Sequence, residues 1–235
     1  MSVTLATDGI VILRAMPETY HQRQFALPPG ATEVILVRHG ASAPAVPGEP
    51  FPLLDGHGDP PLASEGVSQA EAVAVRLARE DLRAIFVTPL QRTHASAAPL
   101  STRTGLPPAV VPDLVEVSLG EWEGGEFRIR MAEGDPIAIQ AVAEERWEVI
   151  PGAETMEALA QRVRVGIQAV VALAGPDTRV AAIVHGGVIG EICRQATGSR
   201  PFAFVHADNG SLTRLIVLPD GGWLLRSFND TAHLA

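Results

Sequence analysis

The sequence contains no lysine, and all 18 of its basic residues are arginines. This absence excludes chemistry that depends on a lysine amine, namely Schiff bases, pyridoxal phosphate anchoring and the P-loop lysine of nucleotide-binding proteins. Acidic residues number 27, which gives a formal charge of −9, and no run of basic residues occurs. A broad nucleic-acid interface is therefore disfavoured, and we expect no nucleic-acid partner.

Cysteine is nearly absent, since Cys193 is the only one in the chain. An intrachain disulfide and a CxxC zinc cluster are thereby excluded. The chain also lacks an uncharged apolar stretch of about 18 residues and a convincing signal peptide at its start, so we expect no membrane partner. The resulting expectation is a soluble protein in the reducing cytoplasm.

Apolar residues make up 46% of the 235 residues, which is enough for a substantial core. One large α/β domain, or at most two small ones, is expected at this length. Residues 1–31 show little periodicity, although Asp8-Gly9 could turn a small hairpin between residues 3–5 and 10–13. Two roles for these residues remain open: they could add a strand that forms a homodimer, or they could be a loose extension.

Short apolar runs alternate with helical periodicity along the rest of the chain. The run from Val34 to Val37 predicts a strand that is buried on both faces, as in a parallel sheet. Residues 120–127 are expected to form a loop. The other predicted elements are strands at 84–87, 108–111 and 180–184, helices at about 64–77, 91–103, 136–149, 154–174 and 186–197, and a hairpin at 212–218 and 223–228. This order predicts an α/β fold, a three-layer αβα sandwich with a mostly parallel central sheet.

Two of the predicted strands end in a histidine that is followed by glycine. The first sequence is Arg38-His39-Gly40, and the second is His185-Gly186-Gly187. Ligand sites in α/β sheets lie at the carboxyl ends of strands, so both histidines are expected at one edge. Arg92 and Glu116 follow two further strands and could reach the same edge.

These residue types together suit phosphoryl transfer. Arginine forks match phosphate oxygens in a bidentate way, and a neutral imidazole is a competent nucleophile near pH 7. A glutamate beside a dianionic phosphate is favoured to hold a proton, which it could pass to the leaving group. The glycines after each histidine would let backbone N–H groups approach an oxyanion. The set indicates a phosphohistidine route that needs no metal ion and no other cofactor.

Six segments in order resemble the histidine phosphatase superfamily, also called the phosphoglycerate-mutase-like superfamily. They are VRHGAS at 37–42, DPPLASEGVSQA at 59–70, TPLQRTHASA at 88–97, LVEVSLGEWEG at 114–124, GAETMEALAQRV at 152–163 and IVHGGVI at 183–189. The similarity covers about residues 34–234 and implies the phosphoglycerate-mutase-like fold for a domain of residues 32–235. The segments at about 43–62 and 125–150 are expected to set substrate specificity.

The resemblance implies a role for each matched residue. His39 would attack phosphorus and become phosphorylated. Glu116 would protonate the departing alcohol and then activate water for the second step. The residues that would hold the phosphoryl group are Arg38, Arg92, His185 and Gly186.

Two departures from the family pattern favour a phosphatase over a mutase. Mutases and several phosphatases carry an asparagine where this chain has Ala45, so one phosphate contact is missing or comes from elsewhere. The longer mutase insertion, with lysines for a bisphosphate, is not matched either. We expect a phosphomonoester hydrolase for a small phosphorylated metabolite. A cofactor-dependent phosphoglycerate mutase and a non-catalytic binding module on the same fold remain open alternatives.

Other polar residues have plainer interpretations. His94 is expected to be structural or on the surface, and Glu121 and Glu123 are expected on a solvated loop. Arg128 suits a solvated face and contact with an anionic substrate equally well. An apolar wall suited to a bulky leaving group is predicted from Phe51, Phe127, Ile129 and Trp147.

Overall fold

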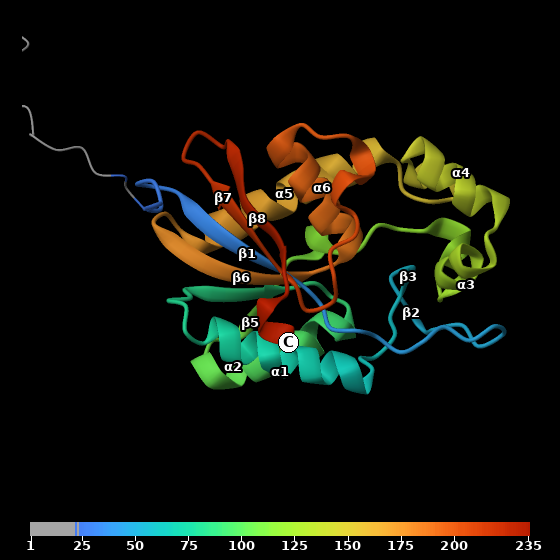
Figure 1. Cartoon of the computed structure of the whole chain (residues 1–235), viewed down its shortest axis with the longest axis horizontal. Coiled ribbons are helices and arrows are strands. Elements are labelled where there is room, and N and C mark those ends of the chain that lie inside the picture. The colour runs from blue at the N-terminus through green and yellow to red at the C-terminus, as the bar shows by residue number, and fades with distance from the viewer. Residues whose placement is uncertain (1–21, 23) are drawn as a thin grey trace, which may run out of the picture.

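The computed structural model describes Gln22 and residues 24–235 (Figure 1). Its centre is a six-stranded sheet in the order β5-β4-β6-β1-β7-β8. The strands are β1 (Thr32–Arg38), β4 (Ala84–Val87), β5 (Pro108–Val110), β6 (Thr178–Val184), β7 (Leu212–Val217) and β8 (Trp223–Asp230). The first four of these strands run parallel to one another, and β7 and β8 add an antiparallel edge. The mostly parallel sheet is therefore confirmed, while the hairpin predicted at 3–5 and 10–13 lies outside the described residues.

Helices cover both faces of the sheet (Figure 1). The helices α1 (Ser64–Leu77) and α2 (Gln91–Thr104) pack together on one face, and α5 (Met156–Ala174) and α6 (Gly186–Thr197) pack on the other. This arrangement confirms the three-layer αβα sandwich. Two further helices, α3 (Glu126–Glu133) and α4 (Pro136–Glu144), lie outside these layers, beyond the carboxyl ends of the parallel strands.

The central strands are buried on both faces because their side chains alternate between two cores. In β1, Val34 and Leu36 belong to the core that α5 and α6 cover, whereas Ile35 and Val37 belong to the core under α1 and α2. Every second side chain therefore meets a different helical layer. A continuous apolar run is what such a strand requires, which is why the sequence pattern identified it.

Local signals account for the ends of the long helices. The Thr155 hydroxyl accepts a hydrogen bond from the Ala158 N–H at the start of α5, as an N-cap residue does. Gly105 ends α2 in the left-handed region, with φ of 72°. Within the part of the chain that the structure describes, no helix combines the length and apolar character needed to cross a membrane.

The region between β5 and α5 differs from the prediction. The sequence predicts a loop over 120–127 and a single helix over 136–149, but α3 already begins at Glu126 and α4 ends at Glu144. Glu145 ends α4 in the left-handed region, with φ of 54°. Glycine usually occupies this position at a helix end, so the sequence gives no signal that the helix stops there.

The long loop after β1 also holds structure that the sequence does not reveal. A short hairpin of β2 (Leu53–Leu54) and β3 (His57–Gly58) forms there. It lies beside α3 in Figure 1. The backbone N–H of Phe51 donates to the Gly124 carbonyl at 2.8 Å, which joins this loop to the segment before α3.

Candidate active site

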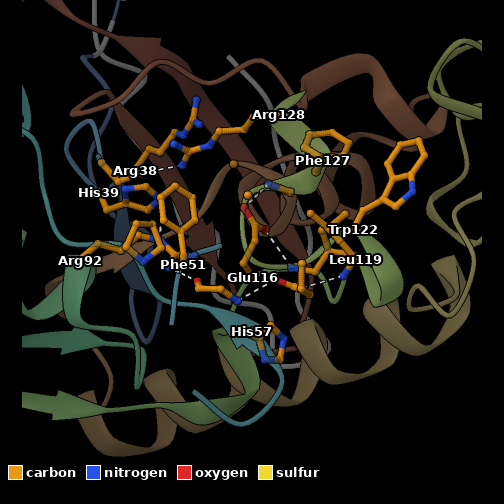
Figure 2. Close-up of a pocket in the computed structure, with 18 of the residues that line it drawn as sticks. Arg38, His39, Phe51, His57, Arg92, Glu116, Leu119, Trp122, Phe127 and Arg128 are labelled. Atoms are coloured by element: carbon orange, nitrogen blue, oxygen red, sulfur yellow. Dashed lines mark hydrogen bonds between the residues drawn. The ribbon is translucent and has the colours of Figure 1, made fainter. Parts of the chain in front are cut away.

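The carboxyl ends of β1, β4 and β6 bring the predicted site residues to one edge of the sheet. Arg38 ends β1 and His39 follows it, His185 follows β6, and Arg92 lies in the first turn of α2 after β4. The rings of His39 and His185 lie edge to face, with centroids 5.2 Å apart. Glu116 reaches the same place from the loop after β5 (Figure 2). The structure thus brings these residues together, and Arg38, His39, Arg92 and Glu116 line one cavity there.

The ring of His39 is buried and oriented by two contacts. Its Nδ1 lies 2.8 Å from the Gly40 carbonyl oxygen, which can only accept, so the ring hydrogen sits on Nδ1. Nε2 therefore carries the lone pair, and the Nε–H of Arg92 donates to it at 3.2 Å. Burial, then the positive charges of Arg92, Arg38 and Arg128, lower the pKa of His39 well below its usual range. The imidazole is consequently neutral at pH 7.

The backbone on both sides of His39 is also fixed. Its carbonyl accepts from the Asn209 side chain at 2.8 Å, and the Gly40 N–H donates to the Ser96 hydroxyl at 2.9 Å. The prediction that this N–H is free for an oxyanion is therefore wrong for Gly40. A Cβ at position 40 would lie 2.3 Å from the Gly66 carbonyl oxygen, so the close approach of α1 requires glycine there.

Arg38 and Arg92 present two positive charges at this edge. Arg38 donates through Nη1 to the Ala207 carbonyl, while its buried Nε has no hydrogen-bond partner among the described residues. Arg92 donates to the Gly58 carbonyl at 2.8 Å and lies 3.7 Å from a carboxylate oxygen of Asp59. Burial lowers the pKa of both guanidinium groups, yet both remain charged at neutral pH.

His185 is fully buried beside His39 and is not part of the cavity wall. Its Nε2 lies 2.9 Å from the Thr88 hydroxyl, and its Nδ1 has no partner in the described part of the chain. Burial, then the charge of Arg92, lower the pKa of His185 well below its usual range, so this ring is neutral as well. The predicted Gly186, by contrast, does line the cavity.

The carboxylate of Glu116 is held at the cavity by backbone donors. The N–H groups of Val117 and Gly187 donate to its two oxygens at 3.0 and 3.3 Å. A Cβ at position 187 would lie 2.7 Å from one of these oxygens, so glycine makes room for the acid. Arg162 of α5 donates to the Glu116 carbonyl at 3.0 Å and pairs with Glu154 at 2.7 Å. Sequence reasoning assigned no role to this brace, although both residues lie in a matched segment.

The cavity has a volume of about 380 Å³. Phe51, Phe127 and Trp147 line it as predicted, whereas Ile129 lies outside its wall. Figure 2 shows Arg38, His39 and Arg92 on one side, and Leu119, Trp122 and Phe127 on the other. The cationic groups therefore lie at one end of the cavity, which we call its charged end, and the side chains of Leu119, Trp122 and Phe127 lie at the other.

Two side chains on the wall were assigned to solvent, wholly or in part, by sequence reasoning. The Glu123 carboxylate accepts from the Gly58 N–H at 2.7 Å and from the Leu119 N–H at 2.8 Å, so its assignment to a solvated loop is wrong. Glu121 is exposed as expected. No spacing signal in GEWEG distinguishes these two glutamates, because the loop has no regular period.

Arg128 is the second of these side chains. It lines the cavity, and its two terminal nitrogens donate to the Ser42 hydroxyl at 2.7 Å and the Ala43 carbonyl at 2.8 Å. Its guanidinium carbon lies 5.5 Å from the centroid of the Phe51 ring. Arg128 is also exposed, so both interpretations, a solvated face and contact with a ligand in the cavity, fit the structure.

The other histidines differ in position. His94 is exposed on α2, as expected, and His57 lines the cavity from β3. Across residues 24–235 and Gln22, no three His, Cys, Asp or Glu side chains gather in a way that could hold a metal ion. Burial raises the pKa of the Cys193 thiol to about 12.

Comparisons with known proteins agree with the motif analysis. The family model of the histidine phosphatase superfamily (branch 1) matches residues 34–231. The chain is 30% identical to the bifunctional protein Rv2228c of Mycobacterium tuberculosis over 206 aligned residues. These residues make up 86% of this chain and 55% of that protein. The chain therefore spans about half the length of this relative.

Two further relatives match along nearly their whole length. The probable phosphoglycerate mutase GpmB of Yersinia enterocolitica is 27% identical over 208 residues, which are 86% of this chain and 94% of that protein. The native structure of the mycobacterial glucosyl-3-phosphoglycerate phosphatase Rv2419c superposes with a TM-score of 0.69 at 26% identity, covering 86% of this chain and 100% of that one. The names of these two relatives thus refer to different activities.

Proposed function

Because this chain belongs to the histidine phosphatase superfamily, we propose that it hydrolyses phosphate monoesters through a phosphohistidine formed on His39. The observation that carries the proposal is the state of the His39 ring. Its hydrogen is committed to the Gly40 carbonyl, so the Nε2 lone pair is directed toward Arg92 and is available for attack. A neutral, pre-oriented imidazole beside fixed cations is what nucleophilic attack on a phosphoryl dianion needs.

In the first step, Nε2 of His39 attacks phosphorus, and the bond from phosphorus to the alcohol oxygen breaks. Arg92 exchanges its bond to Nε2 for one to a phosphoryl oxygen. Two atoms beside His39, the Nε of Arg38 and the Nδ1 of His185, are buried without partners among the described residues. Buried polar atoms normally have hydrogen-bond partners. A phosphoryl oxygen would accept from the Arg38 Nε–H, and it would accept from His185 Nδ1 in the tautomer in which Nε2 accepts from the Thr88 hydroxyl.

Glu116 handles the proton in both steps. As the alcohol leaves, its oxygen takes the proton of the Glu116 carboxyl group, which becomes a carboxylate. Water then attacks the phosphohistidine, gives a proton to Glu116, and displaces the His39 nitrogen to release inorganic phosphate. The backbone donors Val117 and Gly187 keep the acid at the cavity through both steps.

Arginine charge supplies the electrostatic stabilisation in this scheme, so the proposed route needs no metal ion. The test is release of phosphate from p-nitrophenyl phosphate in excess EDTA. We expect the wild type to be active and His39→Ala to be inactive, with the exposed His94→Ala as the matched control. Intact-mass spectrometry of Glu116→Gln should detect one added phosphoryl group, because hydrolysis of the intermediate is slowed. Activity that persists in pure His39→Ala would contradict the proposal, and loss in EDTA would contradict the metal-free route.

A phosphoglycerate mutase is the second candidate, because the GpmB relative, matched over 94% of its length, carries that name. Incubation with 3-phosphoglycerate and 2,3-bisphosphoglycerate separates the two functions. Appearance of the 2-isomer identifies a mutase, and release of phosphate alone identifies a phosphatase. Silence with a broad ester panel would support the binding module.

The cavity favours a small phosphorylated metabolite with an apolar or bulky alcohol. Its volume of about 380 Å³ is within the range of small-molecule sites, and its far wall carries Phe127 and Trp147. A panel of phosphomonoesters should therefore show higher kcat/KM for bulky apolar alcohols. Strict preference for small, highly charged sugar phosphates would contradict this assignment.

A further inference from the structure

Arg128 carries a positive charge that no acidic side chain in the described part of the chain offsets by an ion pair. Both of its hydrogen bonds go to neutral oxygens, of Ser42 and Ala43. Arg130, two residues further along α3, pairs instead with Glu126 at 2.6 Å and Asp135 at 2.9 Å. The charge of Arg128 is therefore available to a ligand in the cavity, whereas that of Arg130 is already engaged.

The contacts of Arg128 place its guanidinium at the charged end of the cavity. Ser42 follows the nucleophile His39 by three residues on the same segment. Figure 2 shows the Arg128 side chain extending toward the side where Arg38 and His39 lie, away from Trp122. The Phe51 ring, 5.5 Å from the guanidinium carbon, supports this position.

Close packing brings α3 against the loop that follows the nucleophile. A Cβ at position 125 would lie 3.0 Å from the Phe51 ring and 3.1 Å from the Cβ of Ala45. Gly125, with φ of 105°, thus lets the start of α3 rest directly on this loop. Arg128, three residues later, can then reach over the segment that carries His39.

Several positive charges act on one another near the nucleophile. Burial, then the cation of Arg38, lower the pKa of Arg128. The Arg128 cation in turn adds to the burial that lowers the pKa values of His39 and Arg92. Like charges held together in this way repel one another, and a multiply charged anion placed among them removes the repulsion.

We propose that Arg128 is a third guanidinium for the phosphoryl group, delivered by α3, alongside Arg38 and Arg92 from the sheet edge. This assignment rests on the proposed function, because that function identifies the bound anion as a phosphoryl group. The Ser42 hydroxyl, which accepts from Arg128, keeps its own hydrogen to donate to the same group. The rival interpretation is that Arg128 binds a carboxylate on the alcohol.

The test compares Arg128→Gln with the matched control Arg130→Gln. Two esters are used, phenyl phosphate and 4-carboxyphenyl phosphate, which differ in one carboxylate group on the alcohol, and each variant is compared with the wild type on the same ester. We expect Arg128→Gln to lower kcat/KM by about ten- to a hundredfold and equally for both esters, the scale of one charge-assisted hydrogen bond. Inhibition by orthovanadate should weaken by a similar factor. A loss confined to the carboxylated ester, or one no larger than that of Arg130→Gln, would overturn the assignment.

Calorimetric titration with inorganic phosphate tests the assignment without relying on turnover. If the wild type hydrolyses neither ester but binds phosphate more tightly than Arg128→Gln does, the proposed function fails and the role of Arg128 stands. If all variants bind phosphate equally, the role of Arg128 fails. Thermal unfolding of each variant checks the fold, and Arg128→Lys replaces Arg128→Gln if the latter is unfolded. Arg128→Lys keeps the charge but loses the fork, so it should show a smaller loss of phosphate affinity.

Discussion

The two sides of the cavity are held in place by different kinds of bonds. We call Arg38, His39 and Arg92 on the cavity wall, together with His185 buried beside His39, the floor. We call residues 41–62 together with 119–133 the cover. In the floor, the His39 N–H donates at 3.0 Å to the carbonyl of Val184, so the nucleophile continues the ladder between two buried strands. In the cover, the contacts that close the cavity come mostly from side chains, such as Glu123 on Gly58.

The two regions also differ in exposure. His185 is fully buried, whereas Leu53, in the hairpin of the cover, is 58% exposed. The floor therefore depends on the buried core, whereas the cover depends on a few hydrogen bonds between loops and to the start of α2, such as that from Arg92 to the Gly58 carbonyl. We expect changes in the floor to act on the chemical step and changes in the cover to act mainly on substrate binding.

The largest expected effect tests the floor through His185. In His185→Gln, the amide group takes the position of Nε2, where its oxygen can accept from the Thr88 hydroxyl, but the group at the Nδ1 position is removed. In His185→Asn, the amide nitrogen replaces Nδ1 and loses the Thr88 contact. Loss of one preorganised donor to a developing oxyanion lowers kcat by about 100-fold or more, so we expect the kcat of His185→Gln to fall by that factor. His185→Asn should retain more activity, as measured by steady-state kinetics with p-nitrophenyl phosphate.

Equal losses in the two variants would mean that His185 serves packing alone. A larger loss in His185→Asn would mean that the contact with Thr88 matters more than the free Nδ1. Thermal unfolding of both variants, measured first, separates a kinetic effect from loss of the fold.

A smaller effect is expected in the cover, at Glu123. Glu123→Gln replaces one acceptor oxygen by a donor, so one of the N–H groups of Gly58 and Leu119 loses its partner. We expect KM to rise by about two- to tenfold, the range of one net hydrogen bond, with kcat less affected. Glu121→Gln, on the exposed face of the same loop, is the matched control. A fall in kcat without a change in KM would show that Glu123 acts on the chemical step, as the floor residues are expected to do, and would contradict the division between floor and cover.

The smallest expected effect is the pH dependence of stability that results from the two buried histidines of the floor, His39 and His185. The native pKa values of His39 and His185 are well below the ordinary value of 6.5, so only the unfolded chain gains protons there as the pH falls. Stability is therefore fully present above about pH 6.5 and is lost as the pH falls toward the native pKa values. Tm should drop between pH 6.5 and 5 by several degrees, because about 1 kcal/mol moves Tm by roughly 2–4 °C in a chain of this size.

His185→Gln should reduce this drop, because one of the two buried groups no longer titrates. His94→Gln, on the exposed face of α2, should leave it unchanged. A drop of the same size in all three proteins would show that other groups govern acid unfolding.

The fold could be predicted where patterns are periodic, and not where loops meet. The strand at 84–87 was predicted with the bounds that β4 has, because apolar runs between helices have few alternatives in an α/β chain. α3 was missed because its eight residues contain no buried side chain and thus carry no apolar stripe. The hairpin of β2 and β3 is too short to produce a recognisable alternation.

The candidate site divides in the same way. Arg38, His39 and His185 were found because each follows or ends a buried strand, where side chains meet at one edge. The role of Gly40 was misassigned, because the partner of its N–H, Ser96, is 56 residues away in sequence. Arg162, Glu123 and Arg128 act through contacts between segments that are 46, 65 and 86 residues apart.

The sequence by itself determined the layers of the sheet, the strand ends and the residue types that can take part in phosphoryl transfer. These follow from local periodicity and from the few residues that can follow a buried parallel strand. The tertiary structure decided which nitrogen of His39 is free, which N–H groups are already engaged, and that Arg128 rather than Arg130 reaches the cavity. The reason is physical: hydrogen bonds and charges act over a few ångströms in space, and the partners that decide them lie far apart along the chain.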